Sequence, residues 1–217
     1  MKKIYILGAG GMAREAYLIL KNLGKDKLVK AFVVENLSEK KHYLDKPIIN
    51  ADVLSNVNKK RVKLIGAIGS PLRRRWIEDL ESKGFSFITL IDASVRMNKT
   101  ISIGAGSLVC AGSVLTCDIK IGRHSIVNVG SSISHDSVIG NFVSLSPGVH
   151  LAGRVKIEDG AWLGIGANII QDIVVGKRAF IAAGALVTRN VPKNTLVMGV
   201  PARPVRLLAE RDWKKLI

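Results

Sequence analysis

The sequence has 217 residues and a formal net charge of +16, with 33 Lys and Arg against 17 Asp and Glu, and this length holds two modest domains. No apolar run reaches the roughly 18 residues of a membrane span and no signal peptide opens the chain, so we expect a cytoplasmic protein that does not insert into a membrane. Aromatic residues make up only 5% and are not interleaved with the basic ones, which disfavours a nucleic-acid partner and favours phosphorylated small molecules.

The N-terminus reads as a short buried strand, a glycine-rich turn and a helix. The apolar stretch 3–7 leads directly into Gly8–Ala13, and a helical pattern follows over 14–23. Such a turn exposes backbone N–H groups and the positive end of the helix, as dinucleotide-binding turns do for phosphate. A second strand over 29–34 ends at Glu35, where a ribose-binding acidic residue belongs. These segments predict a bound nucleotide; a glycine turn needed only for tight packing is the alternative.

A second turn of the same kind follows the third predicted strand, 62–68. Gly69, Ser70 and Pro71 supply a flexible residue, a helix N-cap and a proline at the first helical position, and Gly84 ends the helix. In a parallel sheet the two turns lie at the same edge, so together they frame one ligand.

The remaining N-terminal segments complete a small α/β domain, which we place at residues 1–92. We expect a loop over 36–47, a short helix within 48–57 and a last strand over 85–91. About ninety residues hold half of a dinucleotide-binding domain. The domain size therefore predicts a mononucleotide-sized ligand and argues against a hydride-transferring dehydrogenase.

The second domain, residues 93–217, is built on a repeat of six residues. An aliphatic residue recurs at every sixth position: Ile103, Val109, Leu115, Ile121, Val127, Ile133, Ile139, Leu145, Leu151, Ile157, Leu163, Ile169, Val175, Ile181 and Val187. A period of six fits neither a helix nor one long strand, whereas short strands joined by Gly, Asn, Asp or Ser corners satisfy it. The pattern resembles the hexapeptide-repeat left-handed β-helix, in which three hexads form one triangular coil. A right-handed β-helix or an unrelated repeat scaffold is the alternative.

The cysteine and histidine residues form no recognisable metal motif. Cys110 and Cys117 lack zinc-type pairing and read as reduced, structural residues. His124, His135 and His150 do not show the His-x4-His spacing typical of zinc carbonic anhydrases on the same kind of solenoid, so we expect no metal. His124 reads as a solvated corner residue, and His150 either is structural or lines the active-site cleft.

Several motifs together resemble those of bacterial nucleotide-sugar acetyltransferases. They are the Gly-Ala-Gly-Gly and Gly-Ser turns of the first domain, His135-Asp136 within the repeat, Ser-Pro-Gly-Val-His-Leu-Ala-Gly at 146–153 and Gly-Val-Pro-Ala-Arg at 199–203. The resemblance implies transfer of an acetyl group from acetyl-CoA to the amine of a nucleotide-linked amino-dideoxy sugar, in the synthesis of surface-glycan precursors. It also implies a homotrimer with active sites at subunit interfaces. O-acetylation of a sialic-acid-like sugar is the alternative, and a non-catalytic scaffold would not need the His-Asp pair.

The resemblance also implies roles for single residues. His135 is the expected general base, oriented by Asp136. Because adjacent residues of a strand point to opposite faces, the pairing requires either that the two lie at a corner or that the acid reaches around. The Gly153 N–H is expected to hold the thioester oxygen. The positions implied for acetyl-CoA are Ser144, Gly153, Ile165 and Ala183. The positions implied for the acceptor are Gly10, Gly11, Met12, Glu35, Gly69, Ser70 and Asn128.

The last segment is expected to close the solenoid. Four of its basic residues suit the phosphates of CoA: Arg189, Lys193, Arg203 and Arg206. An apolar pattern of helical period over 205–216 predicts a capping or interface helix.

Overall fold

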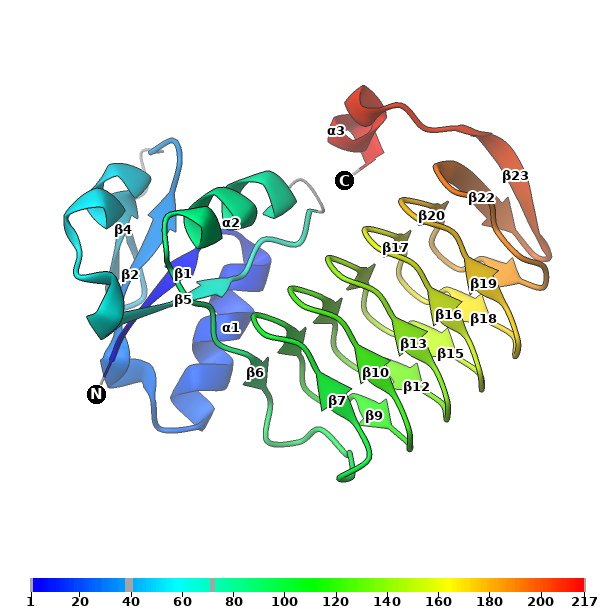
Figure 1. The fold of residues 1–217 in the computed structure, drawn as a ribbon, viewed down its shortest axis with the longest axis horizontal. Helices are drawn as coiled ribbons and strands as arrows, with labels where there is room; N and C mark the ends of the chain where they lie inside the picture. The colour runs from blue at the N-terminus through cyan, green and yellow to red at the C-terminus, as the bar shows by residue number, and fades with distance from the viewer. Residues whose placement is uncertain (1, 38–40, 71–72, 217) are drawn as a thin grey trace.

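The computed structural model describes residues 2–37, 41–70 and 73–216. An N-terminal α/β domain leads into a long parallel β-helix, and the C-terminal segment folds back over the β-helix toward helix α2 of the first domain (Figure 1). Within these ranges, no helix combines the length and the apolarity of a membrane span.

The N-terminal sheet has five strands in the order β3-β4-β2-β1-β5, and only the β3-β4 pair is antiparallel. The strands are β1 (Lys3–Leu7), β2 (Val29–Val34), β3 (His42–Tyr43), β4 (Lys46–Asn50) and β5 (Val62–Gly66). The helices are α1 (Gly11–Asn22) and α2 (Arg73–Ser82), with short 3-10 helices η1 (Asp26–Leu28), η2 (Ala51–Asn56) and η3 (Lys59–Arg61). The apolar side of α1 packs with Ile6 and Phe32, whereas that of α2 packs with Leu7 and Leu64, so the helices cover opposite faces of the sheet.

The strand-turn-helix units predicted from the sequence are present, and the short helix expected within 48–57 is the 3-10 helix η2, which follows the end of β4. Two other expectations in this domain differ from the structure. The loop expected over 36–47 contains β3 and the start of β4, because Ile48 pairs beside Phe32 and extends the sheet. The expected strand over 85–91 is divided: Phe87 bridges to Leu64 of the N-terminal sheet, and the chain then enters the solenoid. The expected role of Pro71 as the first helical residue falls outside the described residues.

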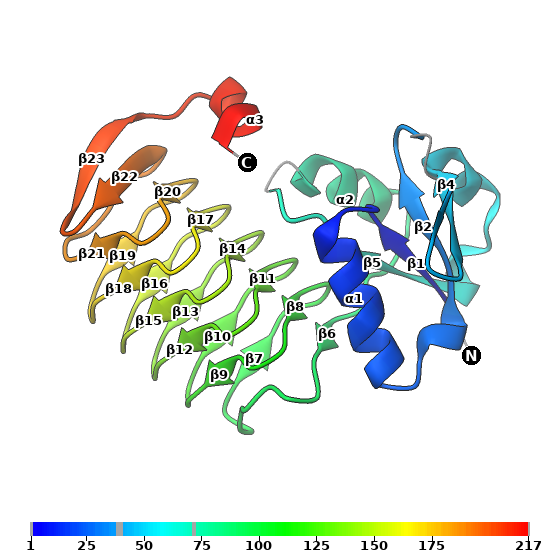
Figure 2. The ribbon, with the colours of Figure 1, turned by 180° about the vertical axis from the view of Figure 1, so that it is seen from behind.

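The solenoid consists of two-residue strands that form three parallel sheets (Figure 2). The strands are β6 (Leu90–Ile91), β7 (Ser102–Ile103), β8 (Leu108–Val109), β9 (Val114–Leu115), β10 (Lys120–Ile121), β11 (Ile126–Val127), β12 (Ser132–Ile133), β13 (Val138–Ile139), β14 (Ser144–Leu145), β15 (His150–Leu151), β16 (Lys156–Ile157), β17 (Trp162–Leu163), β18 (Asn168–Ile169), β19 (Val174–Val175), β20 (Phe180–Ile181) and β21 (Leu186–Val187). Successive coils pair in register, so Val127, Leu145 and Leu163 stack inside the solenoid, each 0% exposed. The sixfold repeat read from the sequence is therefore the inward-facing column of each sheet.

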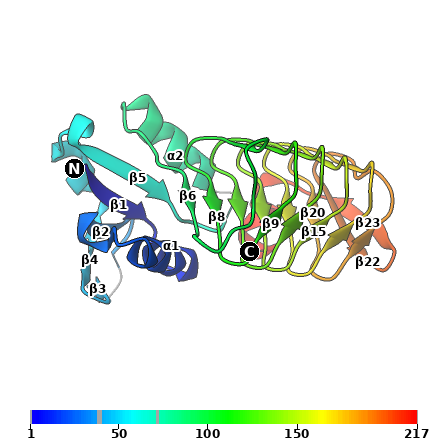
Figure 3. The ribbon, with the colours of Figure 1, turned by 90° about the horizontal axis from the view of Figure 1, so that it is seen from below.

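Three columns of residues with positive φ form the corners of the solenoid. We name them the Phe142 corner (Gly106, His124, Phe142, Gly160, Arg178), the Gly148 corner (Gly112, Gly130, Gly148, Gly166, Gly184) and the Asp136 corner (Asp118, Asp136, Arg154, Asp172). The coil stack is seen from below in Figure 3. Glycine adopts positive φ without a steric penalty, and Asp and Asn tolerate it better than most other residues.

The sheet between the Phe142 and Gly148 corners is covered at both ends. Leu108 and Ile126 pack with the apolar side of α1. At the far end, Phe180 lies 5.8 Å from Trp213, measured between ring centroids. Because strand β6 already belongs to this sheet, the solenoid begins slightly before residue 93, and the division of the chain at residue 92 stays a proposal.

The C-terminal segment contains a hairpin and two short helices. They are β22 (Thr195–Gly199), β23 (Ala202–Leu207), η4 (Glu210–Asp212) and α3 (Trp213–Leu216). The helix expected over 205–216 is therefore wrong at its start, because Val205 to Leu207 pair with β22 in an antiparallel ladder. On β23, Arg206 forms an ion pair of 2.8 Å with Asp212.

Candidate active site

His135 and Asp136 form a hydrogen-bonded pair at the Asp136 corner. They directly follow β12, and Asp136 has a φ of 60°, which turns the chain and lets its carboxylate reach back to the preceding side chain. Oδ2 of Asp136 lies 2.8 Å from Nδ1 of His135. This contact favours the tautomer that carries its proton on Nδ1, which leaves the Nε2 lone pair free to accept a proton. The side chain of His135 is 47% exposed, so this nitrogen is accessible.

Gly153 lies one coil beyond His135, directly against the imidazole. A Cβ at Gly153 would lie 2.6 Å from both Cε1 and Nε2 of His135. The next residue, Arg154, donates its backbone N–H to the His135 carbonyl at 2.8 Å, which fixes the two coils to each other. No acceptor in the described part of the chain takes a hydrogen bond from the Gly153 N–H. A basic nitrogen and a backbone donor therefore lie side by side at this corner.

Two further charges follow on the same corner. Arg154 binds Asp172 with both ends of its guanidinium, Nε to Oδ1 at 2.6 Å and Nη2 to Oδ2 at 2.9 Å. The hydrogen bond from Arg154 is the largest influence on Asp172 and lowers its pKa, and the charge of His135 acts in the same direction. The imidazole thus has carboxylates on its own coil and two coils away, with the Arg154 guanidinium between them.

Ile165, Ala183 and Asn128 lie on the Gly148 corner. Ile165 is 62% exposed, and the Gly184 N–H donates to its carbonyl at 2.8 Å, so Ile165 and Ala183 are stacked neighbours. Asn128 turns its side chain back on its own corner, where Oδ1 accepts the Val129 N–H at 2.8 Å. The Gly148 and Asp136 corners bound opposite edges of the sheet that contains β12, so a single chain does not bring these residues to His135.

His150 projects from the sheet between those two corners. It follows Ser132 by one coil, and its Nδ1 lies 2.8 Å from the Ser132 hydroxyl. Its side chain is exposed, so the residue is part of the surface that joins the Gly148 and Asp136 corners.

Ser144, expected at the acetyl-CoA site, lies instead at the junction of the two domains. It is 4% exposed, and its hydroxyl accepts from Arg73 Nη1 at 2.8 Å and donates to the Gly69 carbonyl at 3.2 Å. The outward side of β14 is covered by the N-terminal domain, which the sequence repeat alone does not reveal. We therefore assign Ser144 to the junction and leave it out of the acetyl-CoA site.

The first glycine turn is open to solvent. Gly10 precedes α1 as its N-cap and has no side chain to occupy the free N–H groups of the first helical turn. Apart from the adjacent residues and the backbone of α1 itself, no described heavy atom lies within 4 Å of a Cβ built on Gly10 or Gly11. Met12 is half-buried and packs against the α1 core. Gly10 and Gly11 thus leave space beside the positive end of the helix, where an anion is stabilised.

The structure brings the second turn and Glu35 to the same edge as the first turn. Gly69 and Ser70 follow β5, which pairs with β1, and Glu35 follows β2 on the other side of β1. A Cβ at Gly69 would also meet open space. Six of the seven acceptor positions predicted from the sequence therefore lie at the carboxyl edge of three adjacent parallel strands, and Asn128 does not.

His124 is not the solvated residue that the sequence predicts. It is 1% exposed, its ring stacks on Phe142 at 5.0 Å between centroids, and Nε2 lies 2.8 Å from Oε1 of Glu81 on α2. Arg123 also pairs with Glu81. Because α2 covers the Phe142 corner, residues that look external in the repeat are buried. Because His124 and Phe142 are one coil apart, the stacking of their rings could be predicted from the sequence. Nothing in the local sequence indicated that Glu81 is the partner of His124.

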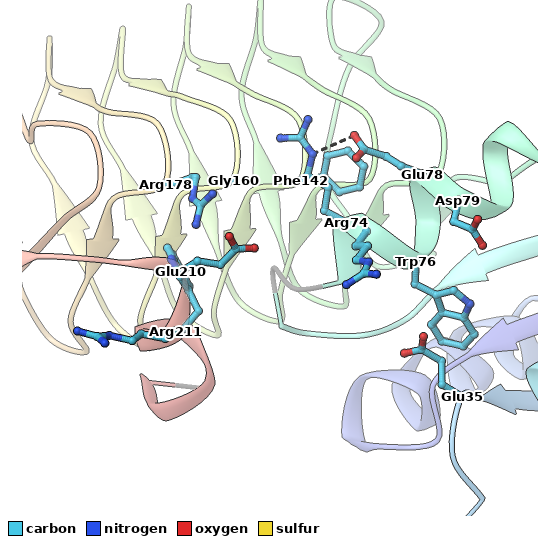
Figure 4. A pocket seen from close by; sticks show the side chains of 12 residues that line it. Glu35, Arg74, Trp76, Glu78, Asp79, Phe142, Gly160, Arg178, Glu210 and Arg211 are labelled. Carbon is cyan, nitrogen blue, oxygen red and sulfur yellow. Dashed lines mark hydrogen bonds and ion pairs between the residues drawn. The ribbon is translucent and has the colours of Figure 1, made fainter.

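A cleft of about 1250 Å³ opens between α2 and the C-terminal segment, over the Phe142 corner. Glu35 and Trp76 lie at one end, and Glu210 and Arg211 lie at the other (Figure 4). His135 is not among the residues that line this cleft, because it lies on a different corner. Across the described residues, no three His, Cys, Asp or Glu side chains gather as a metal site.

Two family models match the chain. The PglD N-terminal domain matches residues 3–80, and the bacterial transferase hexapeptide (six repeats) matches residues 154–189. With the fold, they define a hexapeptide-repeat transferase, whose β-helix is left-handed as the sequence resemblance implied. A PglD N-terminal domain followed by hexapeptide repeats is similar to the arrangement of the NeuD/PglD-type sugar N-acetyltransferases, which agrees with the family resemblance found in the sequence.

Several solved structures resemble nearly the whole chain, among them two that contain acetyl-CoA or CoA. The acetyltransferase domain of PglB from Neisseria gonorrhoeae FA1090, in complex with acetyl coenzyme A, is 27% identical with a TM-score of 0.86, over 94% of this chain and 99% of that chain. A variant of GDP-perosamine N-acetyl transferase from Caulobacter crescentus, in complex with CoA and GDP-perosamine, is 28% identical with a TM-score of 0.88, over 95% and 98%. Both relatives are acetyltransferases that hold acetyl-CoA or CoA, which is the class predicted from the sequence.

Among curated proteins, the matches are shorter. The 2,3,4,5-tetrahydropyridine-2,6-dicarboxylate N-acetyltransferase of Staphylococcus aureus (strain bovine RF122 / ET3-1) is 45% identical over 67 residues, which are 30% of this chain and 28% of that protein. The chain spans about a third of the length of the curated relatives it matches.

Proposed function

We propose that this protein transfers the acetyl group of acetyl-CoA to the amine of a nucleotide-linked amino-dideoxy sugar. The observation that carries the proposal is the Asp136 corner, where an accessible imidazole, oriented by a carboxylate, lies against the Gly153 backbone. The solved relatives with acetyl-CoA or with CoA and GDP-perosamine support both substrates. A role in surface-glycan precursors and a cytoplasmic location stay predictions from the sequence.

In the proposed reaction the sugar amine attacks the thioester carbonyl directly. The new N–C bond forms while the carbonyl pair moves to oxygen, and the amine proton passes to Nε2 of His135; the oxyanion then collapses, the C–S bond breaks, and CoA leaves as the thiolate, which takes the proton back from the imidazolium or from water. Asp136 stabilises the imidazolium and holds the tautomer. The Gly153 N–H suits the developing oxyanion, because a backbone donor that is already in place needs no reorganisation.

The N-terminal domain is proposed to hold the nucleotide part of the acceptor. The turns at Gly10 and Gly69 open at one sheet edge, with the positive ends of α1 and α2 beside them, which favours phosphate. Glu35 at the same edge offers a carboxylate for a ribose or base. The backbone groups of the two turns suit the phosphates of any nucleotide, so they do not determine which nucleotide is bound.

The acetyl-CoA site is proposed to be completed by a second subunit. Ile165 and Ala183 lie on one corner of the solenoid and His135 on another, and the cleft over the Phe142 corner is lined by none of the three. In a homotrimer, the Asp136 corner of one subunit meets the Gly148 corner of the next. The exposed apolar side chains of Val129, Ile165 and Ile170 would then be covered.

A single assay tests the proposed reaction. The purified protein is incubated with acetyl-CoA and a panel of UDP-, GDP- and dTDP-linked amino sugars together with a sialic acid, thiol release is followed, and products are identified by mass spectrometry. Mild alkali then separates the two linkages, because it cleaves an acetyl ester and leaves an amide intact. An alkali-stable product is the expected result. An alkali-labile product on a sialic-acid-like sugar would establish the alternative, and thiol release equal to the acceptor-free rate with every sugar would overturn the proposal.

A further inference from the structure

Arg73, the first residue of α2, is buried although it carries a charge. It is 2% exposed. Its Nη1 donates to two carbonyls of the second glycine turn, Gly69 O at 3.0 Å and Ser70 O at 3.2 Å. Because a peptide unit is planar, fixing the Gly69 carbonyl toward Arg73 turns the Ser70 N–H to the opposite side. Arg73 therefore sets the orientation of the peptide that opens the turn.

The same guanidinium also binds the solenoid. Nη1 donates to the Ser144 hydroxyl at 2.8 Å, and Nη2 donates to the carbonyls of His124 at 3.0 Å and Val143 at 3.1 Å. Ser144 adds a direct link, since its hydroxyl donates to the Gly69 carbonyl. One side chain thus joins the turn to two successive coils of the β-helix.

Stability alone is a poor explanation for this arrangement. The hydrogen-bond acceptors of Arg73 are four carbonyls and a hydroxyl, and no described carboxylate pairs with it. Burial lowers the pKa of Arg73 to about 9, so the group is still charged at neutral pH. Burial without a paired anion destabilises the charged form of Arg73. Its position at the positive end of α2 adds a second unfavourable electrostatic interaction.

We propose that Arg73 is a positioning residue that locks the Gly69–Ser70 turn onto the solenoid in the form that receives the nucleotide phosphates. The inference deepens the proposed function, because it assumes that this turn binds the nucleotide part of the acceptor. The uncompensated positive charge of Arg73 also favours an anion at this turn, even though the N–H groups face away from the guanidinium.

Two substitutions at Arg73 and one control test the proposal. Arg73→Met removes the charge and the forked donors while keeping an extended side chain, and Arg73→Lys keeps only the charge. Arg123→Met is the matched control, because Arg123 also bridges α2 and the solenoid but does so through Glu81 and, at 3.5 Å, Glu78. Both arginines support the junction, and only Arg73 holds the turn.

We expect Arg73→Met to raise the acceptor KM on the order of tenfold while the acetyl-CoA KM and kcat stay within about twofold. The acceptor KM of Arg73→Lys should lie between those of Arg73→Met and the native protein. Arg123→Met should lower the melting temperature and leave the acceptor KM unchanged. An unchanged acceptor KM in a folded Arg73→Met protein would overturn the inference, as would an equal KM change in the Arg123→Met control.

A second measurement separates this inference from the proposed function. Binding of UDP, GDP and dTDP is measured by calorimetry, and hydrogen exchange is followed in the peptide that contains Gly69 and Ser70. Native protein that binds none of the three would contradict the nucleotide site, and faster exchange in Arg73→Met than in Arg123→Met would still support the lock. Equal exchange rates of this peptide in both variants would contradict the inference that Arg73 locks the turn. If Arg73→Met does not fold, Ser144→Ala replaces it, with a smaller change in the same direction expected.

Discussion

The imidazole of His135 lies so close to Gly153 that a methyl group on Gly153 would come within 2.6 Å of its Cε1 and Nε2 atoms. Contacts below about 3 Å do not occur between a real Cβ and a ring carbon, so one of the two must move. Since the Gly153 backbone is held by the coil on each side, through Asp172 N–H at 3.1 Å and through Arg154, the imidazole is the part that is displaced.

Gly153→Ala is therefore expected to reduce kcat by displacing the base, without unfolding the solenoid. A double-mutant cycle checks this cause: in a His135→Ala background the added methyl meets no ring, so Gly153→Ala should cost little more. Losses that multiply in the double variant would show that Gly153 acts independently of His135. Circular dichroism and melting temperature serve as controls for folding.

His135→Ala should lower kcat by about 10²- to 10⁴-fold, which is the usual contribution of a general base. Acetyl-CoA affinity should change little, because the side chain is assigned to the proton and not to the cofactor. Steady-state kinetics with both substrates varied provide the test. An unchanged kcat would remove the base assignment, and ping-pong kinetics or an acetylated enzyme trapped without acceptor would contradict direct transfer.

Asp136→Asn should cost less than His135→Ala, about tenfold in kcat. The carboxylate stabilises the imidazolium that forms when His135 accepts the amine proton, and the neutral amide does not, although its oxygen can still accept the hydrogen bond from Nδ1. Steady-state kinetics of the two variants, measured side by side, provide the test. An unchanged kcat in Asp136→Asn would mean that the carboxylate only orients the ring.

The repeat made most of the solenoid predictable. Each inward residue is fixed by its own hexad, so Val127, Leu145 and Leu163 could be placed without knowing any distant contact. The His135–Asp136 contact could also be predicted, and of the two ways in which these adjacent side chains could meet, the structure shows the corner. The contact shows that His135 is oriented by Asp136, whereas the catalytic role of His135 has to be tested by an assay of the reaction.

The junction between the domains could not be predicted in the same way. Arg73 lies 70 and 71 positions before its partners Val143 and Ser144, and no local pattern links residues so far apart. Likewise, the outward position of Ser144 on β14 predicts exposure in an isolated solenoid, and only the N-terminal domain buries it. The strand over Val205 to Leu207 was missed because a short apolar run fits a helix or a strand until its partner is known.

Unfolding should become easier at mildly acidic pH because of His124. Burial is the largest influence on His124 and lowers its pKa below the usual 6.5, against the opposing attraction of Glu81. Its Nδ1 is also buried without a hydrogen-bond partner, so a proton there would gain no acceptor. A group with a lowered folded-state pKa contributes stability that is present above its unfolded pKa and is lost as pH falls toward the folded value.

The melting temperature of the native protein should therefore fall between pH ~7.5 and ~5.5, and His124→Phe should make it nearly constant over this range. The substitution keeps a ring between Phe87 and Phe142 and removes the titrating nitrogen. The pKa of Glu81 is lowered as well, since hydrogen bonds from His124 and Arg123 outweigh the larger single influence of burial, but this carboxyl titrates at lower pH. Equal slopes for both proteins would contradict the assignment to His124.

Subunits that are inactive on their own should restore activity when they are mixed, because the proposed site takes His135 from one subunit and Ile165 from its neighbour. His135→Ala removes the base, and Ile165→Asp places a charge on the apolar corner that is proposed to hold the CoA arm. In a trimer with random mixing of equal amounts, each interface joins a native His135 to a native Ile165 with a probability of about one quarter, so about a quarter of native activity should return on co-expression.

Sedimentation must show trimers for both single variants, since a monomeric Ile165→Asp protein could not take part. In that case Ala183→Trp, which obstructs the same corner without adding charge, would replace Ile165→Asp. If both residues served a site within one subunit, every chain would carry a defect and no mixture would recover. Full activity of the native protein as a monomer would also contradict a site shared between subunits.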